Sequence, residues 1–162
     1  MAELSQFNAL SPADAEHELL ACCAAPAWAR EVAAGRPYRD VLALRAAGDR
    51  AARHLTWDDV ARALSAHPRI GERPAGDDRE STWSRREQAG VAESAKEALA
   101  EANRAYEERF DHVFLIFATG KTDAEMLAAA RARLANDEET ERGVVRNELR
   151  KIALLRLERL VS

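Results

Sequence analysis

Residues 139–160 read ETERGVVRNELRKIALLRLERL, and this stretch decides the fold. Apolar residues recur at intervals of three and four positions with charged residues between them, which is typical of a helix with one buried side. The stretch contains no proline, so nothing in it interrupts a helix. We therefore predict a long final helix whose inward-facing residues are Val145, Leu149, Ile152, Leu155 and Leu160.

The same spacing extends from this stretch toward the N-terminus. It predicts a long helix over residues 84–109 and another that begins at Thr122 or Asp123 and ends near Leu134. In the first half, caps and prolines indicate shorter helices. These helices are predicted over residues 11–24, starting at Ser11-Pro12; over 26–35, ending at Gly35; over 40–52, with apolar Val41, Leu42, Leu44 and Ala51; and after a Thr56–Asp59 cap, with Val60, Ala61 and Leu64 buried.

Two stretches depart from the helical pattern. Residues 113–118, VFLIFA, form a continuous apolar run that fits either a buried extended segment or a short buried helix, and periodicity does not decide between them. Residues 67–83 are rich in proline, glycine and charge, which predicts a long loop. Loops longer than about 12 to 15 residues inside a compact domain are usually functional or disordered.

The pattern as a whole predicts an all-α, single-domain helical bundle of about six to eight helices over residues 1–162. The length of 162 residues falls within the usual size of one domain, and 47% hydrophobic residues are enough to fill one core. There is no internal repeat and no alternating strand pattern with hairpin turns.

Charge and cysteine usage exclude several classes of protein. The formal net charge is −4, and the basic residues are interleaved with acidic ones, which disfavours nucleic-acid binding. No apolar stretch approaches the roughly 20 residues that span a bilayer, and the N-terminus has no signal-peptide pattern. The adjacent Cys22 and Cys23 are poorly placed to bridge each other. We therefore expect a cytoplasmic protein that does not bind a membrane.

His67 is the first candidate for chemistry because it stands at a helix end, directly before Pro68, in a polar stretch. Proline restricts the backbone of the residue before it, and an imidazole with a pKa near 6.5 is suited to proton transfer at neutral pH. The alternative is structural, since a cationic histidine near a helix C-terminus interacts favourably with the helix dipole.

Glu87 also has two interpretations. Ser84-Arg85-Arg86-Glu87 is a capping box, in which the serine caps a helix and the glutamate bonds back to the capping residue. A carboxylate at that place can equally orient an imidazole, with Ser84 and Gln88 offering hydrogen bonds to a polar ligand.

Arg156 lies among leucines in the apolar part of the final helix, where an arginine is seldom buried without a partner. It either extends to the surface, pairs with an acid such as Glu148, or faces a pocket where its guanidinium grips a carboxylate. The apolar run at 113–118 fits plain core, or a pocket lined by its backbone. The sequence contains no metal-binding spacing of cysteine or histidine and no phosphate-binding glycine loop, so we expect neither metal nor cofactor.

Taken in order, these residues resemble the 2-oxo-4-hydroxy-4-carboxy-5-ureidoimidazoline (OHCU) decarboxylase family over nearly the whole chain. Single motifs are weak, but the ordered set is specific. It comprises Phe7-Asn8, Ala25-Pro26-Ala27-Trp28, His67-Pro68-Arg69-Ile70-Gly71, Ser84-x-x-Glu87-Gln88-Ala89-Gly90, Tyr106 with Phe110, the run from Phe114 to Gly120, Glu148-Leu149 with Lys151-Ile152-Ala153, and Leu155-Arg156-Leu157.

The resemblance implies an all-helical homodimer that needs no cofactor and converts OHCU to (S)-allantoin with loss of carbon dioxide. It also implies roles: His67 as catalytic acid, Glu87 as its partner and Arg156 as a third polar group of one active centre. The stretches implied to contact the substrate comprise Pro68, Ser84, Arg85, Arg86, Gln88, Phe114, Leu115, Ile116, Phe117 and Ala118. Residues 72–82 diverge from the family, and no role is carried over to them.

The alternative interpretation is a non-enzymatic helical module, such as a regulator or assembly protein whose final helix binds a partner. Its distinguishing feature would be an exposed apolar stripe along residues 139–160.

Overall fold

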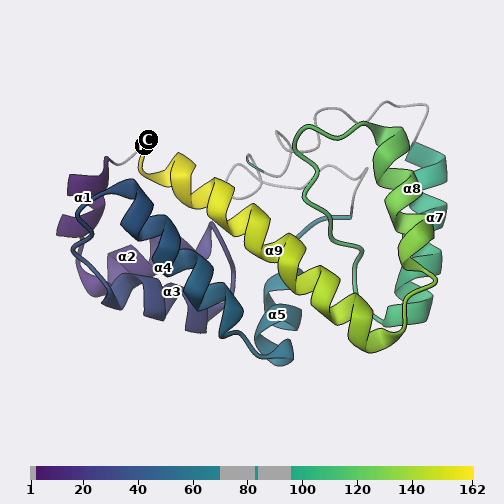
Figure 1. The fold of residues 1–162 in the computed structure, drawn as a ribbon, viewed down its shortest axis with the longest axis horizontal. Coiled ribbons are helices and arrows are strands. Elements are labelled where there is room, and N and C mark those ends of the chain that lie inside the picture. Colours follow the sequence, from purple (N-terminus) through teal and green to yellow (C-terminus); the bar gives the residue numbers. More distant parts are fainter. Residues whose placement is uncertain (1–2, 70–82, 84–95) are drawn as a thin grey trace. The chain divides into compact units, whose positions relative to one another are not determined.

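Residues 3–69, Trp83 and 96–162 are described in a computed structural model of the chain (Figure 1). They form eight α-helices and no strand, which confirms the predicted all-α fold. The helices are α1 (Leu4–Ala9), α2 (Pro12–Leu20), α3 (Pro26–Ala34), α4 (Val41–Arg53), α5 (Trp57–Leu64), α7 (Lys96–Phe110), α8 (Asp123–Arg133) and α9 (Glu138–Leu160).

The predicted caps are confirmed by their hydrogen bonds. The Ser11 hydroxyl accepts from the N–H of Asp14 at 3.1 Å, directly before Pro12 opens α2. Thr122 and Glu125 form a capping box at α8, which settles Thr122 as its cap. Each such bond satisfies an N–H group that a helix start leaves without a partner. The other predicted ends are also found, at Asp40 before α4, at Thr56 with Asp59 before α5, and at Gly35 after α3.

The short helix α1 is a finding that the sequence pattern did not predict. It has only six residues and one buried side chain, Phe7, so it offers too few turns for a periodic signal. Its carbonyl end is held from outside, because the Arg36 guanidinium donates to the carbonyls of Phe7 at 2.9 Å and Leu10 at 2.8 Å. Asn8 exchanges two hydrogen bonds with the backbone of Tyr38, each 2.9 Å long.

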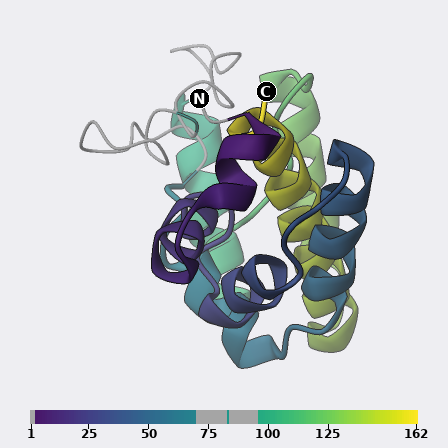
Figure 2. The same cartoon turned by 90° about the vertical axis from the view of Figure 1, so that its left-hand side faces the viewer.

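The described residues divide into two compact units, and α9 contributes to both. The first unit joins Met1–Ala63 to Leu149–Ser162. In it α2 packs on α3 and α3 on α4, and the C-terminal part of α9 runs beside α4 (Figure 2). The close approach depends on Gly48 of α4. A Cβ at that position would stand 2.8 Å from a methyl group of Leu157, and the Gly48 carbonyl accepts from the Trp28 indole at 3.0 Å.

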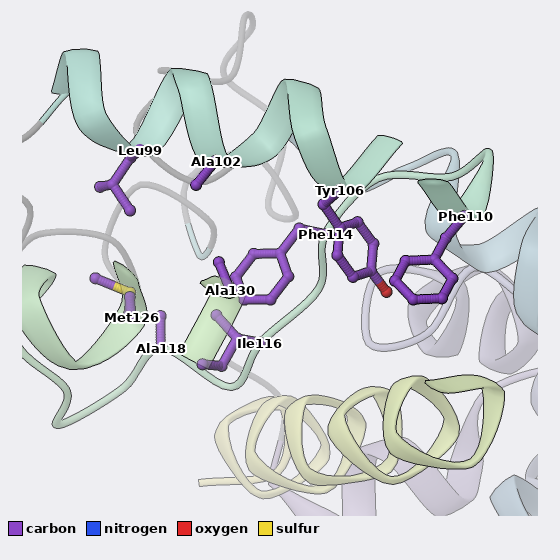
Figure 3. Packing of buried hydrophobic residues seen from close by; sticks show 9 residues of the cluster. All are labelled: Leu99, Ala102, Tyr106, Phe110, Phe114, Ile116, Ala118, Met126 and Ala130. Carbon is purple, nitrogen blue, oxygen red and sulfur yellow. The ribbon is translucent and has the colours of Figure 1, made fainter. Parts of the chain in front are cut away.

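The second unit comprises Leu64–Glu148, where α7 packs against α8. Between these helices residues 113–118 are not helical, and the side chains of Phe114, Ile116 and Ala118 join the apolar cluster between them (Figure 3). Alternate side chains thus enter this cluster, as in an extended chain, while Leu115 is buried outside it. Of the two alternatives left open for this run, the extended one is correct. The full cluster is Leu99, Ala102, Tyr106, Phe110, Phe114, Ile116, Ala118, Met126 and Ala130.

Two predicted buried positions are wrong, each by two residues. On α4, for which only the loose spacing of the apolar residues was predicted, Leu44 and Ala51 are buried, whereas Val41 is 40% and Leu42 75% exposed. On α5 the exposed Ala61 is replaced in the core by Ala63. On α9 Leu155 is half-buried, and Leu157 is buried instead; the other four predicted positions are buried as expected. Alanine and leucine occupy both sides of these helices, so hydrophobicity alone misplaces the boundary of the buried side.

Cys22 and Cys23 are both buried free thiols. Among the described helices, none combines the length and the hydropathy that crossing a lipid bilayer requires.

The packing of Gly48 predicts that one substitution has opposite effects at two helical glycines. Gly143→Ala on α9 meets no atom within 4 Å, so the gain in helix propensity should stabilise the protein by about 0.5 to 1 kcal/mol. Gly48→Ala should lose that gain, because the new methyl group must displace the buried side chain of Leu157. Urea unfolding of both variants measures the difference, and equal stabilisation at the two positions would contradict the described packing.

Candidate active site

His67 lies just beyond the end of α5 and is half-buried together with Pro68. Its backbone N–H donates to the carbonyl of Leu64 at 3.0 Å, which closes the last turn before the chain leaves the helix. Two residues later, Arg69 Nε donates to both carboxylate oxygens of Glu107 on α7, at 2.9 and 3.1 Å. The segment that carries His67 is thus tied to a helix on each side.

The extended segment, residues 113–118, is bounded by two left-handed residues. Asp111 has φ 63° and donates its N–H to the carbonyl of Glu107 at 2.8 Å, which ends α7. Gly120 has φ 80° in the turn before α8. Asparagine, aspartate and glycine tolerate this conformation best, so the residue types fit both reversals.

One edge of the extended segment is held by hydrogen bonds with side chains. The Leu115 carbonyl accepts from Arg133 Nη1 at 2.7 Å, and the Phe117 N–H donates to Glu148 Oε1 at 3.0 Å. The Phe117 carbonyl accepts from Lys121 Nζ at 2.9 Å. In an extended chain the backbone groups of alternate residues face the same edge, so Leu115 and Phe117 share this edge.

The opposite edge belongs to Ile116. Within the described residues no hydrogen bond reaches the N–H or the carbonyl of Ile116, although the residue is only 4% exposed. A buried backbone pair of this kind normally has a partner. The N–H of Ile116 can donate to the carbonyl of an amide or urea group, and the Ile116 carbonyl can accept from the N–H of the same group.

A buried ionic network holds Arg133, the residue that donates to the Leu115 carbonyl. Glu141 on α9 is fully buried, and its carboxylate accepts from Arg133 Nε at 2.8 Å, from Asn136 Nδ2 at 2.9 Å and from the Tyr106 hydroxyl. The Arg133 guanidinium also lies over the Phe114 ring, 4.5 Å from its centroid. The same guanidinium therefore joins the network to the extended segment.

The network sets the protonation of its members. Burial acts to raise the pKa of Glu141, but the hydrogen bonds from Arg133, Tyr106 and Asn136 outweigh it and lower that pKa below its ordinary value of 4.5. Burial, followed by the hydrogen bond to Glu141, raises the pKa of the Tyr106 hydroxyl. At neutral pH the carboxylate is therefore charged and the phenol stays protonated as its donor.

Arg156 belongs to the first unit and is 1% exposed, so it does not extend to the surface. Its Nη1 donates to the Ala21 carbonyl through a long contact of 3.4 Å. Two of the three interpretations of Arg156 therefore remain: it pairs with an acid, or it binds a ligand carboxylate.

The predicted site residues do not all lie in one described unit. The extended segment and His67-Pro68 lie in the second unit, Arg156 lies in the first, and each unit is described by itself. Five predicted residues, Ser84, Arg85, Arg86, Glu87 and Gln88, lie outside the described residues. Their roles, and those of His67 and Arg156, stay predictions.

Sequence reasoning missed Arg133 and Glu141, and it considered Glu148 only as one possible partner of Arg156. A signal was present in the register of the helices. Glu141 stands four residues before the buried Val145, and Arg133 stands three after the buried Ala130. A charged residue at a core position of a helix indicates a buried polar contact.

The OHCU decarboxylase family model matches residues 8–158. The chain belongs to the OHCU decarboxylase family. Its resemblance to that family, inferred from ordered motifs, is confirmed.

Curated members and relatives of OHCU decarboxylases agree with this membership. The chain is 34% identical over 154 residues to the uric acid degradation bifunctional protein TTL of Arabidopsis thaliana, which covers 91% of this chain and 47% of that protein. It therefore spans about half the length of that relative. It is 31% identical over 132 residues to the 2-oxo-4-hydroxy-4-carboxy-5-ureidoimidazoline decarboxylase of Haloferax volcanii, which covers 80% of this chain and 79% of that one.

Solved structures match the OHCU decarboxylase fold. A crystal structure of OHCU decarboxylase in the presence of (S)-allantoin superposes with a TM-score of 0.76 at 30% identity, covering 89% of this chain and 96% of that one. A crystal structure of (S)-allantoin synthase gives a TM-score of 0.73 at 17% identity, covering 100% of this chain and 54% of that one, and supports the fold alone.

The protonation of Glu141 predicts a pH dependence of stability. Because its pKa is lower in the folded chain than the ordinary 4.5, the stabilisation is present above about pH 4.5 and is lost as the pH falls through the folded-state pKa. Glu141→Ala leaves Arg133 buried without its carboxylate, which should cost about 3 to 5 kcal/mol at pH 7. Urea unfolding between pH 3 and pH 7 would contradict the network if wild type and Glu141→Ala lost stability in parallel on acidification.

Proposed function

We propose that this chain is a carboxy-lyase of urate degradation that converts OHCU to (S)-allantoin and carbon dioxide. The observation that carries the proposal is the family match over residues 8–158, accompanied by 30% identity to a structure of OHCU decarboxylase obtained with (S)-allantoin. The match covers 96% of that structure, so the likeness extends over nearly its whole length.

The chemistry requires no external electron sink. The carboxylate of OHCU is attached to C4, which also bears the hydroxyl group, and the neighbouring C5 is part of the ring C=N bond. When the C4–CO₂ bond breaks, its electron pair moves into a C4=C5 double bond, the C=N nitrogen takes up a proton, and an enol results. Transfer of a proton to C5 and loss of the hydroxyl proton, which makes C4 a carbonyl, then complete allantoin. Hydrogen-bond donors placed where the negative charge develops contribute most to such a rate, about 3 to 4 kcal/mol for each well-placed donor. Side chains and backbone groups suffice for this task.

His67 is proposed as the acid that holds the substrate hydroxyl or oxyanion and directs the proton to one face. The half-buried position of His67 and the bond of Arg69 to Glu107 support this role, since both restrict the segment that carries the imidazole. Glu87 is proposed to orient the imidazole, and Arg156 to act as the third polar group of the centre. Burial of Arg156 supports its role, because a guanidinium removed from water gains most from a carboxylate ligand.

The substrate-contacting stretches are proposed to be Pro68, residues 84–88 and residues 114–118. The Ile116 backbone supports the last of these, because OHCU carries a ureido group whose carbonyl and N–H complement a neighbouring backbone donor and acceptor. Two matched hydrogen bonds to backbone would also discriminate against substrates that lack the ureido arm.

The finer expectations of assembly and compartment belong to the same proposal. We propose one domain over residues 1–162, acting as a cytoplasmic homodimer without a cofactor. The free thiols of Cys22 and Cys23 are consistent with a reducing compartment.

The alternative, a non-enzymatic helical module, lacks support at its distinguishing feature. The large apolar side chains that are exposed among the described residues are Val41 and Leu42 on α4, whereas Val145, Leu149 and Leu157 of α9 are buried. A partner-binding stripe on the final helix is therefore not favoured.

The proposed reaction predicts an optically active product. Urate oxidase and hydroxyisourate hydrolase generate OHCU in solution, and added protein should accelerate its decay and give the circular dichroism of (S)-allantoin. The reason is facial control of the proton, which the spontaneous reaction lacks. Decay at the spontaneous rate with a racemic product would sink the decarboxylase proposal.

His67→Ala should lower turnover by about two to four orders of magnitude, the usual contribution of a positioned general acid, with little change in unfolding temperature. His54→Ala is the matched control, because His54 is an exposed histidine paired with Glu31 at 3.0 Å. Initial rates of OHCU decay measure both variants. If both retained near-normal rates, the acid would have to be assigned elsewhere.

A further inference from the structure

Glu148 on α9 fixes the extended segment at the residue next to Ile116. We propose that Glu148 is a positioning residue: its buried carboxylate holds the Phe117 N–H and thereby aims the Ile116 backbone at the substrate. The inference rests on the proposed function, and it assigns Glu148 no contact with substrate. The contact that carries it is the 3.0 Å hydrogen bond from Phe117 N–H to Glu148 Oε1.

A carboxylate is a costly group to bury for packing alone. Glu148 is 7% exposed, and an ionised carboxylate loses several kcal/mol of hydration when it leaves water unless it is hydrogen-bonded. A hydrogen bond between a backbone N–H and a charged oxygen is shorter and stronger than one between neutral groups. Glu148 is therefore suited to holding a backbone segment at a fixed distance from a helix.

The position of the contact decides what it controls. The Leu115 carbonyl is held by Arg133 and the Phe117 carbonyl by Lys121, and the hydrogen bond from the Phe117 N–H to Glu148 is the one that acts on the peptide group directly after Ile116. The peptide group between Ile116 and Phe117 contains both the Phe117 N–H and the Ile116 carbonyl. Because a peptide group is planar, holding its N–H sets the direction in which its carbonyl points.

Binding groups act only when they are held close to the productive geometry, within about 0.5 Å. Without Glu148 the peptide group is free to rotate, and the Ile116 carbonyl then no longer faces a ureido N–H. The chain can remain folded, because the Arg133–Glu141 network is a separate set of contacts. Substrate affinity is therefore expected to fall more than stability.

The experiment compares Glu148→Ala, which removes the acceptor, with Glu148→Gln, whose amide oxygen still accepts from the Phe117 N–H. Glu138→Ala is the matched control on the same helix, since Glu138 pairs with Arg142 at an exposed site. Calorimetric titration with (S)-allantoin gives Kd, and OHCU decay gives KM and kcat. Hydrogen exchange of the Phe117 amide, followed by NMR, reports the contact itself.

We expect Glu148→Ala to raise both the Kd for (S)-allantoin and the KM for OHCU about tenfold, or 1.4 kcal/mol, with faster exchange of the Phe117 amide. Glu148→Gln should recover most of the affinity, and Glu138→Ala should match wild type. A purely structural role would instead lower the unfolding midpoint and leave Kd and KM of the folded protein unchanged.

Each outcome gives a decision. Wild-type affinity in a folded Glu148→Ala variant with a fast-exchanging Phe117 amide would overturn the positioning role. If Glu148→Ala does not fold, Glu148→Asp replaces it, because its shorter side chain keeps the charge but withdraws the acceptor from Phe117. Weaker binding in Glu148→Asp than in Glu148→Gln supports the proposal, and the reverse order overturns it. Inactive wild type would instead refute the proposed function.

Discussion

Arg133 and Glu141 meet in the interior of the second unit, and the extended segment depends on that ion pair. Neither charge would be stable there alone, because the free energy lost when an ion leaves water exceeds the free energy gained by packing its side chain. Together with Tyr106 and Asn136 they satisfy one another, and the Nη1 group of the guanidinium remains to donate to the Leu115 carbonyl. A non-helical run between two helices thus obtains from side chains the hydrogen bonds that a neighbouring strand would otherwise supply.

Because side chains and not a neighbouring strand supply these hydrogen bonds, the two edges of the segment differ. Side-chain partners from α8 and α9 occupy the edge that Leu115 and Phe117 share, and no partner within the described residues occupies the edge of Ile116. Alternate side chains meanwhile anchor the run in the apolar cluster between α7 and α8. Core packing and the proposed ligand contact therefore use different groups of one short segment: side chains fix it in the apolar cluster, and the Ile116 backbone is the part proposed to bind the ligand.

Sequence reasoning recovered the parts of the fold that depend on local chemistry. Ser11, Pro26, Asp40 and Thr122 each act within one turn of a helix, so the helix starts could be read directly. The family itself followed from the order of its motifs. The extended form of residues 113–118 could not be read, because its hydrogen bonds come from Arg133 and Glu148, which lie 18 and 31 residues away from their partners. Contacts at such separations leave no periodic trace in the chain.

The proposed recognition of the ligand by the Ile116 backbone has an evolutionary consequence. A point mutation replaces a side chain but leaves every residue other than proline with the same N–H and carbonyl. Homologues can therefore drift at this position in hydrophobic shape while keeping the same recognition groups, and selection should act mainly on whichever residues keep the peptide plane oriented. Sequence variation at residue 116 would then be a poor guide to whether two relatives share a ligand.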